Sequence, residues 1–235
     1  MDFFNRLQGI FFNPKVTLKA ISEKPIWIST LIILLIALAL FNYITAPYLQ
    51  KDTLQLLQSS DKLQERMGED RFNRMIERAE NPSTTSVLIS NFLTKPVVLL
   101  VGILFSSLII LVMSRIFSTE GNYKQVFAAI LHANFIDKIL GNALRLVLIL
   151  TRKSFMQTTT SLALFFPKLE VTSSAFIILS QVDFFQLWLF GVLGYGLSSI
   201  FKVELKKALI LSYSFWALKS LLNIAIGLFS MRFIT

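Results

Sequence analysis

The residues best suited to chemistry in this sequence are polar side chains that interrupt apolar segments. One group keeps the spacing of a single α-helical face, i, i+4, i+8 and i+11, with a carboxylate beside it: Asn134, Lys138, Asn142, Arg145 and Asp137. Lys219 interrupts a second apolar segment near its middle, with Asn223 one turn further on. Because an ionisable group is costly in lipid, we treat these residues as a candidate intramembrane polar site.

Three uses fit this polar stripe: it could line an aqueous cavity, bind a lipid head group, or form structural contacts between helices. We favour structural contacts, because polar side chains are ordinary partners between packed membrane helices. We expect Lys219 to pair with Asp137, since Asp183 lies at the end of a predicted helix and no other carboxylate lies inside one.

Motifs for catalysis or cofactor binding are absent from the sequence. It contains no phosphate-binding loop, dinucleotide fingerprint, nucleophile elbow or zinc-protease motif. It has no cysteine and a single histidine, His132, so thiolate sites and multi-histidine metal sites are excluded. We therefore expect no enzymatic activity, no metal and no cofactor.

The composition predicts that these residues belong to a membrane protein. Of 235 residues, 54% are apolar and 16% are charged, whereas a soluble domain is about 25% charged. Long apolar segments predict an all-α integral membrane bundle of about five transmembrane helices. We place the spans at 26–48, 96–116, 126–150, 184–201 and 208–229, within a membrane domain that covers 26–235.

The remaining segments predict helices outside the membrane core. Residues 1–25 predict two amphipathic interfacial helices, the first with Phe3, Phe4, Leu7, Ile10 and Phe11 on one face and the second beginning at Pro14 after Asn13. Packing of that apolar face on the protein's own loops is the alternative to lying in lipid. The loop 51–95 holds seven basic and seven acidic residues and reads as helical, with a break at Asn81–Thr85. The connection 154–182 is apolar but broken by Pro167, so we expect it to lie in the interface or to cover the bundle.

The basic residues outside the loop 51–95 predict the orientation. Nine of them fall on one side if the N-terminus is cytoplasmic: Arg6, Lys15, Lys19, Lys24, Arg115, Lys124, Lys202, Lys206 and Lys207. Arg152, Lys153 and Lys168 oppose this assignment. We predict a multi-pass protein with a cytoplasmic N-terminus, a basic face that attracts anionic lipid head groups, and no nucleic-acid partner.

Small residues in the span 184–201 predict close helix packing. Gly191, Gly194 and Ser198 stand at i, i+3 and i+7, a spacing that lets another helix approach. Asp183 precedes the span and is placed to cap its first amides.

Several strings, in this order along the chain, resemble the Yip-type family of multispanning membrane proteins. They are Phe12-Asn13-Pro14-Lys15, then Gly121-Asn122-Tyr123-Lys124, then Asp183-Phe184-Phe185-Gln186-Leu187-Trp188 with Gly191, and finally Phe201-Lys202. Eukaryotic members interact with Rab-type GTPases in Golgi and endoplasmic-reticulum traffic. The sequence departs from the family pattern at Asn134-Phe135, where a proline is usual, and lacks a long cytosolic tail before its first span.

The resemblance implies a short, bacterial-type member located in the cytoplasmic membrane. Some relatives of that branch are encoded beside exporter-type ABC transporters, whereas Rab binding is not implied for it. We therefore expect a membrane organiser or an accessory subunit of a membrane complex. The alternative is a small transporter or lipid-handling protein that uses the polar stripe with Lys219.

Overall fold

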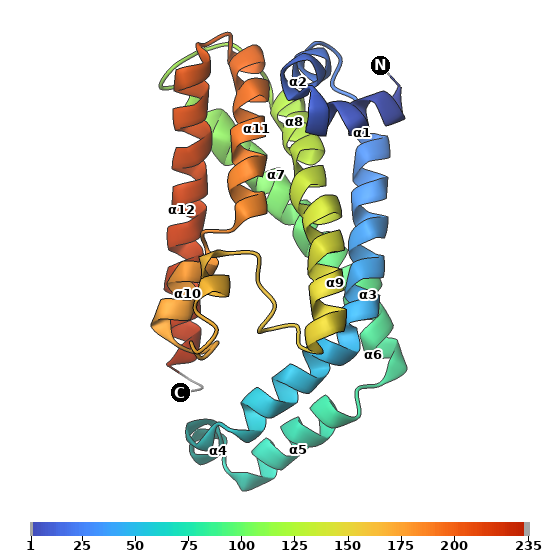
Figure 1. Cartoon of the computed structure of the whole chain (residues 1–235), viewed down its shortest axis with the longest axis vertical. Helices are drawn as coiled ribbons and strands as arrows, with labels where there is room; N and C mark the ends of the chain where they lie inside the picture. The colour runs from blue at the N-terminus through green and yellow to red at the C-terminus, as the bar shows by residue number, and fades with distance from the viewer. Residues whose placement is uncertain (1, 233–235) are drawn as a thin grey trace. The chain divides into compact units, whose positions relative to one another are not determined.

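The computed structural model describes residues 2–232 (Figure 1). The chain divides into two compact units. The first unit comprises Met1–Ala39, Lys95–Asn142 and Phe184–Lys219. The second comprises Leu40–Thr94, Ala143–Asp183 and Ser220–Thr235. Both units are built from helices, which confirms the predicted all-α class.

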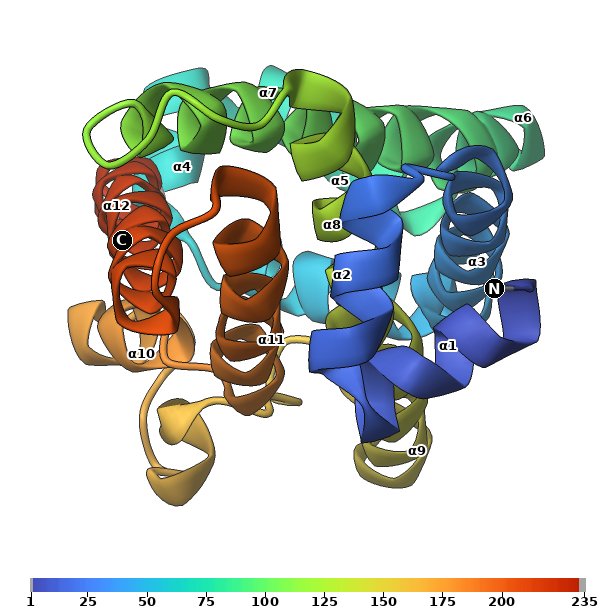
Figure 2. The same cartoon turned by 90° about the horizontal axis from the view of Figure 1, so that it is seen from above.

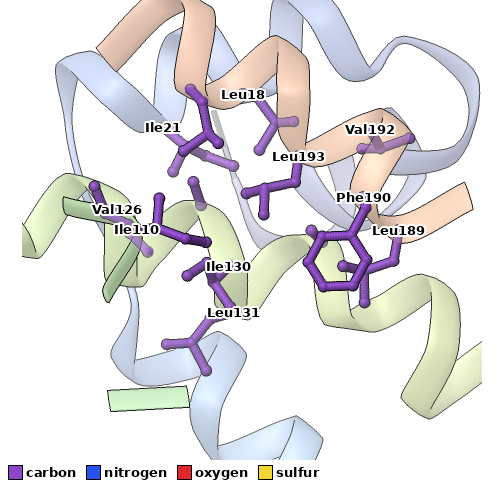
Figure 3. Close-up of a cluster of buried hydrophobic side chains, with 14 of the residues drawn as sticks. Leu18, Ile21, Ile110, Val126, Ile130, Leu131, Leu189, Phe190, Val192 and Leu193 are labelled. Carbon is purple, nitrogen blue, oxygen red and sulfur yellow. The ribbon is translucent and has the colours of Figure 1, made fainter. Parts of the chain in front are cut away.

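Helix α8 (Tyr123–Phe135) forms the centre of the first unit. Every residue from Val126 to Phe135 is buried, and the alanines among them leave room for neighbouring helices to approach. Helices α1 (Phe3–Phe12), α2 (Pro14–Glu23), α7 (Lys95–Ser114) and α11 (Phe184–Phe201) all pack on α8, and α7 crosses it obliquely (Figure 1). Figure 3 shows part of the resulting core, where Leu18 and Ile21 of α2 meet Leu193 of α11 and Ile130 of α8.

Helices α1 and α2 meet at a sharp bend beside α11 (Figure 2). Helix α2 begins at Pro14 and ends before Pro25 as the sequence predicts, although the side chain of Asn13 makes no capping bond. Ile10 is fully buried, and Phe3, Leu7 and Phe11 pack against the core. Most of the apolar face that we expected to lie in lipid therefore packs on the protein itself.

Four helical segments within residues 2–232 are long and apolar enough to cross a membrane. They are α3 (Ile28–Gln58), the continuous run Thr84–Ser114, α11, and α12 (Leu205–Met231). The run Thr84–Ser114 comprises α6 (Thr84–Ile89), the π-helical η1 (Ser90–Thr94) and α7. Helix α3 continues beyond the end of the expected span 26–48, and the run Thr84–Ser114 begins before the expected span 96–116.

The expected span 126–150 is helical throughout but is not one of these four. It consists of α8, a π-helical segment η2 (Ile136–Gly141) and α9 (Asn142–Arg152). Asp137, Lys138 and Arg145 lower its hydropathy. By length and composition the chain thus has four candidate spans in its described part rather than five.

The second unit joins the end of α3 to short helices and an irregular connection. The loop 51–95 is helical as predicted, with α4 (Asp61–Met67) and α5 (Glu69–Glu80), and Ser83 caps α6 after the expected break. Gln50 of α3 donates to the carbonyl oxygens of Ala79 and Glu80, which fixes α5 beside α3. The connection 153–183 contains the 3₁₀ segment η3 (Leu162–Phe165) and α10 (Ser174–Ser180).

Candidate functional site

The polar residues at the end of α8 are held by bonds within their own helical run. The Asn134 amide donates to the Ile130 carbonyl oxygen over 2.8 Å. Lys138 Nζ lies 2.7 Å from Asp137 Oδ2, and the Asp137 side chain is almost fully buried. These three residues therefore satisfy much of their polarity locally.

The π-helical η2 interrupts the regular helical spacing on which the predicted stripe is based. The i, i+4, i+8 spacing assumes an uninterrupted α-helix, and a π turn holds an extra residue, which rotates the following register by about 100°. Asn142 is buried at the end of η2, where its backbone amide donates to the Asp137 and Ile139 carbonyl oxygens. Only Asn134 and Lys138 of the stripe line the cavity described next.

A cavity of about 230 Å³ lies in the first unit between α7, α8 with η2, α11 and α12. We call it the polar cavity. Its polar lining consists of Ser106, Asn134, Lys138, Gln186 and Lys219. The rest of its wall is Gly102 and apolar residues, including Val98, Ile103, Phe190, Leu193 and Phe215. Two lysines that the sequence separates by some eighty residues thus share one small space.

Lys219 has a different partner from the one expected. Its Nζ donates to Gln186 Oε1 over 3.2 Å and lies 5.9 Å from the centre of the Phe190 ring. In the part of the chain that the structure describes, Lys219 forms no ion pair, so the predicted Asp137–Lys219 salt bridge is wrong. The physical reason is that Lys138 is adjacent to Asp137 and takes the closer position.

Arg145 takes part in a cluster within the second unit. Its Nη2 lies 3.1 Å from Asp183 Oδ2, and its Nε donates to Thr160 Oγ1 over 3.1 Å. Thr160 Oγ1 donates in turn to the same carboxylate. Asp183 therefore holds α9 and the irregular connection together, which is a role beyond the helix cap that the sequence suggested.

Two buried polar groups escaped the sequence analysis. In the first unit, His132 Nε2 lies 2.9 Å from Thr30 Oγ1 and its Nδ1 lies 2.8 Å from the Ala128 carbonyl oxygen. In the second unit, Asp52 Oδ2 accepts bonds from Ser154 Oγ and from the backbone amides of Phe155 and Met156. No local spacing links His132 to Thr30 or Asp52 to residues 154–156, because each pair lies about a hundred residues apart in sequence, so only the fold reveals these contacts.

Two of the strings that resemble the Yip-type family, around Gly121 and Phe201, meet at one end of the first unit. Gly121 has a φ of +79°, and a Cβ placed on it would lie 2.7 Å from side-chain atoms of Ile200 and Phe201. Ser118 Oγ donates to the Phe201 carbonyl oxygen over 2.6 Å, and Lys202 Nζ lies 3.3 Å from Glu120. Glycine at 121 is required here both by its φ and by this close approach.

Aromatic side chains join the same end of the unit to its core. Tyr123 donates its hydroxyl to the Leu104 carbonyl oxygen over 3.1 Å and stacks on Phe127. Trp188 makes an edge contact with Phe11, with ring centres 6.2 Å apart. These contacts place the aromatic members of the strings between α1, α7, α8 and α11.

The small residues of α11 face α12 in part. A Cβ on Gly191 would lie 2.9 Å from Tyr213 Oη, and one on Gly194 would lie 2.5 Å from Leu209 Cδ2. Tyr213 donates to the Leu187 carbonyl oxygen, which secures this contact. Ser198 instead donates to the Val203 carbonyl oxygen in the connection between α11 and α12.

Helical spans, buried polar contacts and an apolar outer surface define a multispanning membrane protein of the all-α class. The family model described as Yip1 domain matches residues 9–227, so the chain belongs to the Yip1 domain family. No curated protein and no solved structure matches the chain.

Proposed function

We propose that this Yip1 domain protein acts without enzymatic activity as an organiser or accessory subunit of a complex in the bacterial cytoplasmic membrane. The strongest support is that α1 packs on the core and still exposes two large apolar side chains. Its core-facing side is fixed by Ile10, yet Phe4 and Phe12 are 74% and 88% exposed. A rigid helix that presents two phenylalanines suits docking to a membrane interface or to a partner.

Exposed lysines near α1 favour anionic lipid head groups as the lipid partner. Lys15, Lys19 and Lys24 are exposed on and after α2. The Gln125 amide donates to the Ser22 carbonyl oxygen, which places the start of α8 and its Lys124 beside the same end. A basic end of this kind is typical of a cytoplasmic face, and each lysine near anionic lipid contributes about 1 kcal/mol. The N-terminus is accordingly cytoplasmic in this proposal.

The test replaces Phe4 and Phe12 by serine and compares affinity capture from native membranes with that of the unchanged chain. Membrane insertion should persist, because the buried face of α1 is untouched, while recovery of associated membrane proteins should fall several-fold. Gln8→Ser, on the exposed polar face of the same helix, is the matched control. An ABC-type exporter is the partner to look for first. Unchanged recovery in the double variant would refute docking through α1.

A lipid-handling or transport role is the second candidate, and the polar cavity favours it. Two lysines in one small cavity of the helical bundle are more than a packing role for the cavity requires. An organiser should keep its partners when Lys219 is neutralised, provided that the fold survives. A lipid-handling protein should lose its lipid instead, and that difference separates the two roles.

A further inference from the structure

The polar cavity has a positive lining that its surroundings balance only in part. Among the residues that the structure describes, its wall contains the side chains of Lys138 and Lys219 and no carboxylate. Asp137 neutralises Lys138 through the 2.7 Å ion pair. Lys219 bonds to Gln186, an uncharged amide, and the structure from residue 2 to residue 232 gives its ammonium no ion-pair partner. One positive charge therefore remains for an occupant of the cavity.

The depth of Lys219 makes this charge significant. It is near the middle of α12, about 20 Å along the helix from Leu205 at a rise of 1.5 Å per residue. Lysines near helix ends reach the aqueous interface, but a lysine at this depth faces hydrocarbon or a polar space. Lys219 lines the polar cavity with an exposed side chain, and a counter-anion held there would stabilise the ammonium.

The other polar groups of the cavity suit an oxygen-rich anion. The Asn134 side chain uses one amide hydrogen for the Ile130 carbonyl oxygen, and an amide group carries two such hydrogens. Lys219 and Lys138 are ammonium donors with three hydrogens each. Charge-assisted bonds from such donors to phosphate or carboxylate oxygens are short and strong.

The volume of the cavity indicates which part of a ligand it takes. A space of about 230 Å³ equals that of roughly eight molecules of liquid water, at ~30 Å³ each. It accepts a phosphodiester but no acyl chain. Apolar groups line its outer edge on α7, where Val98 is 65% exposed and Gly102 leaves open space. An acyl chain would lie along that edge, outside the cavity.

We propose that the polar cavity binds the singly charged phosphodiester of an anionic phospholipid, with Lys219 as its counter-charge and its acyl chains against α7. This goes beyond the accessory role, because a chain that only organises partners needs no anion site. The proposal also names the class of ligand, an anionic phospholipid, for the lipid-handling or transport role. The partner capture with the Phe4 and Phe12 variant does not test it, so the two proposals fail separately.

The experiment measures lipid retention by native mass spectrometry of the full chain in detergent, with equal amounts of phosphatidylglycerol and phosphatidylcholine. The unchanged chain should retain phosphatidylglycerol at least tenfold more than phosphatidylcholine. In Lys219→Gln, the retention of phosphatidylglycerol should fall to that of phosphatidylcholine. In Lys219→Arg, which keeps the positive charge, the preference for phosphatidylglycerol should remain. Lys206→Gln is the control, because Lys206 is an exposed lysine of the same helix that does not line the polar cavity.

Three results would overturn the proposal. Equal retention of the two lipids would show that the cavity does not select an anion. A preference lost in Lys206→Gln but kept in Lys219→Gln would assign the lipid to the basic end of the unit. Displacement of phosphatidylglycerol by soluble glycerol phosphate at equal concentration would identify a site for free anions. Thermal unfolding of each variant identifies any loss of fold, and Lys219→Arg then decides between loss of charge and loss of structure.

Discussion

Asp52 offers the sharpest test of how the second unit is held together. A single oxygen of its carboxylate accepts three hydrogen bonds, from Ser154 Oγ at 2.9 Å, Phe155 N at 2.6 Å and Met156 N at 2.7 Å. All three donors lie at the start of the irregular connection 153–183, so this carboxylate fixes the connection to the end of α3. Two replacements separate its charge from its bonds: Asp52→Asn keeps an acceptor oxygen, and Asp52→Ala removes it.

The magnitudes follow from the number and type of these bonds. A hydrogen bond to a charged group contributes about 1.5–3 kcal/mol and a neutral one about 1 kcal/mol. Because the freed backbone amides are only partly buried and regain water, we expect about 3 kcal/mol for Asp52→Ala and about 1.4 kcal/mol for Asp52→Asn. Residues 154–156 detach in a small fraction of the molecules. We expect that fraction to rise about 100-fold in Asp52→Ala and about tenfold in Asp52→Asn.

Limited trypsin digestion in detergent measures that population, because Arg152 and Lys153 lie directly before the anchored residues. Cleavage after Lys153 should be fastest in Asp52→Ala, slower in Asp52→Asn and slowest in the unchanged chain. Cleavage at Lys206 in the first unit is the internal control, and Glu77→Gln, an exposed carboxylate of the second unit, is the control variant. Equal cleavage rates after Lys153 in all of these proteins would refute the anchoring role.

Three further predictions concern the first unit and the orientation. Gly121→Ala should cost about 2 kcal/mol or more and lower the unfolding temperature more than Gly68→Ala, because both glycines have a positive φ but only a Cβ at 121 meets side chains. Thr30→Val should cost about 0.6–1.7 kcal/mol in thermal unfolding, since it leaves His132 Nε2 without its buried partner. A cysteine at the exposed Ser59 should react with an impermeant maleimide added to intact cells, and protection of that cysteine would reverse the orientation.

Apolar runs and breakers predicted the fold class and most helices of this chain. Pro14 begins α2, Ser83 precedes α6, and Phe184 begins α11, as the sequence indicates. Such signals act over one helical turn, which is why they are visible in a single sequence. Helix lengths were less well predicted, since α3 continues through Pro47 to Gln58, where polar residues keep a helical pattern beyond the apolar run.

Packing partners were harder to predict, because they depend on contacts between distant segments. The apolar face of α1 shows this limit. Its spacing correctly indicates one apolar side, but the same spacing suits lipid and protein equally, and only the positions of α8 and α11 show that Ile10 is buried while Phe4 is not. Asp52 similarly belongs to a loop with balanced charges and gives no local sign of its three donors.

The candidate site was predicted in its residue types but not in its pairing. Asn134, Lys138 and Lys219 were selected because polar groups inside apolar helices are costly, and that rule depends on composition alone. Asp137 pairs with its neighbour Lys138 inside the π-helical segment Ile136–Gly141, and no motif in the sequence announces that segment. Because Lys138 engages Asp137, the charge of Lys219 is left to the polar cavity. The error in the predicted pair and the inferred anion site thus have one cause, the local ion pair of Asp137 with Lys138.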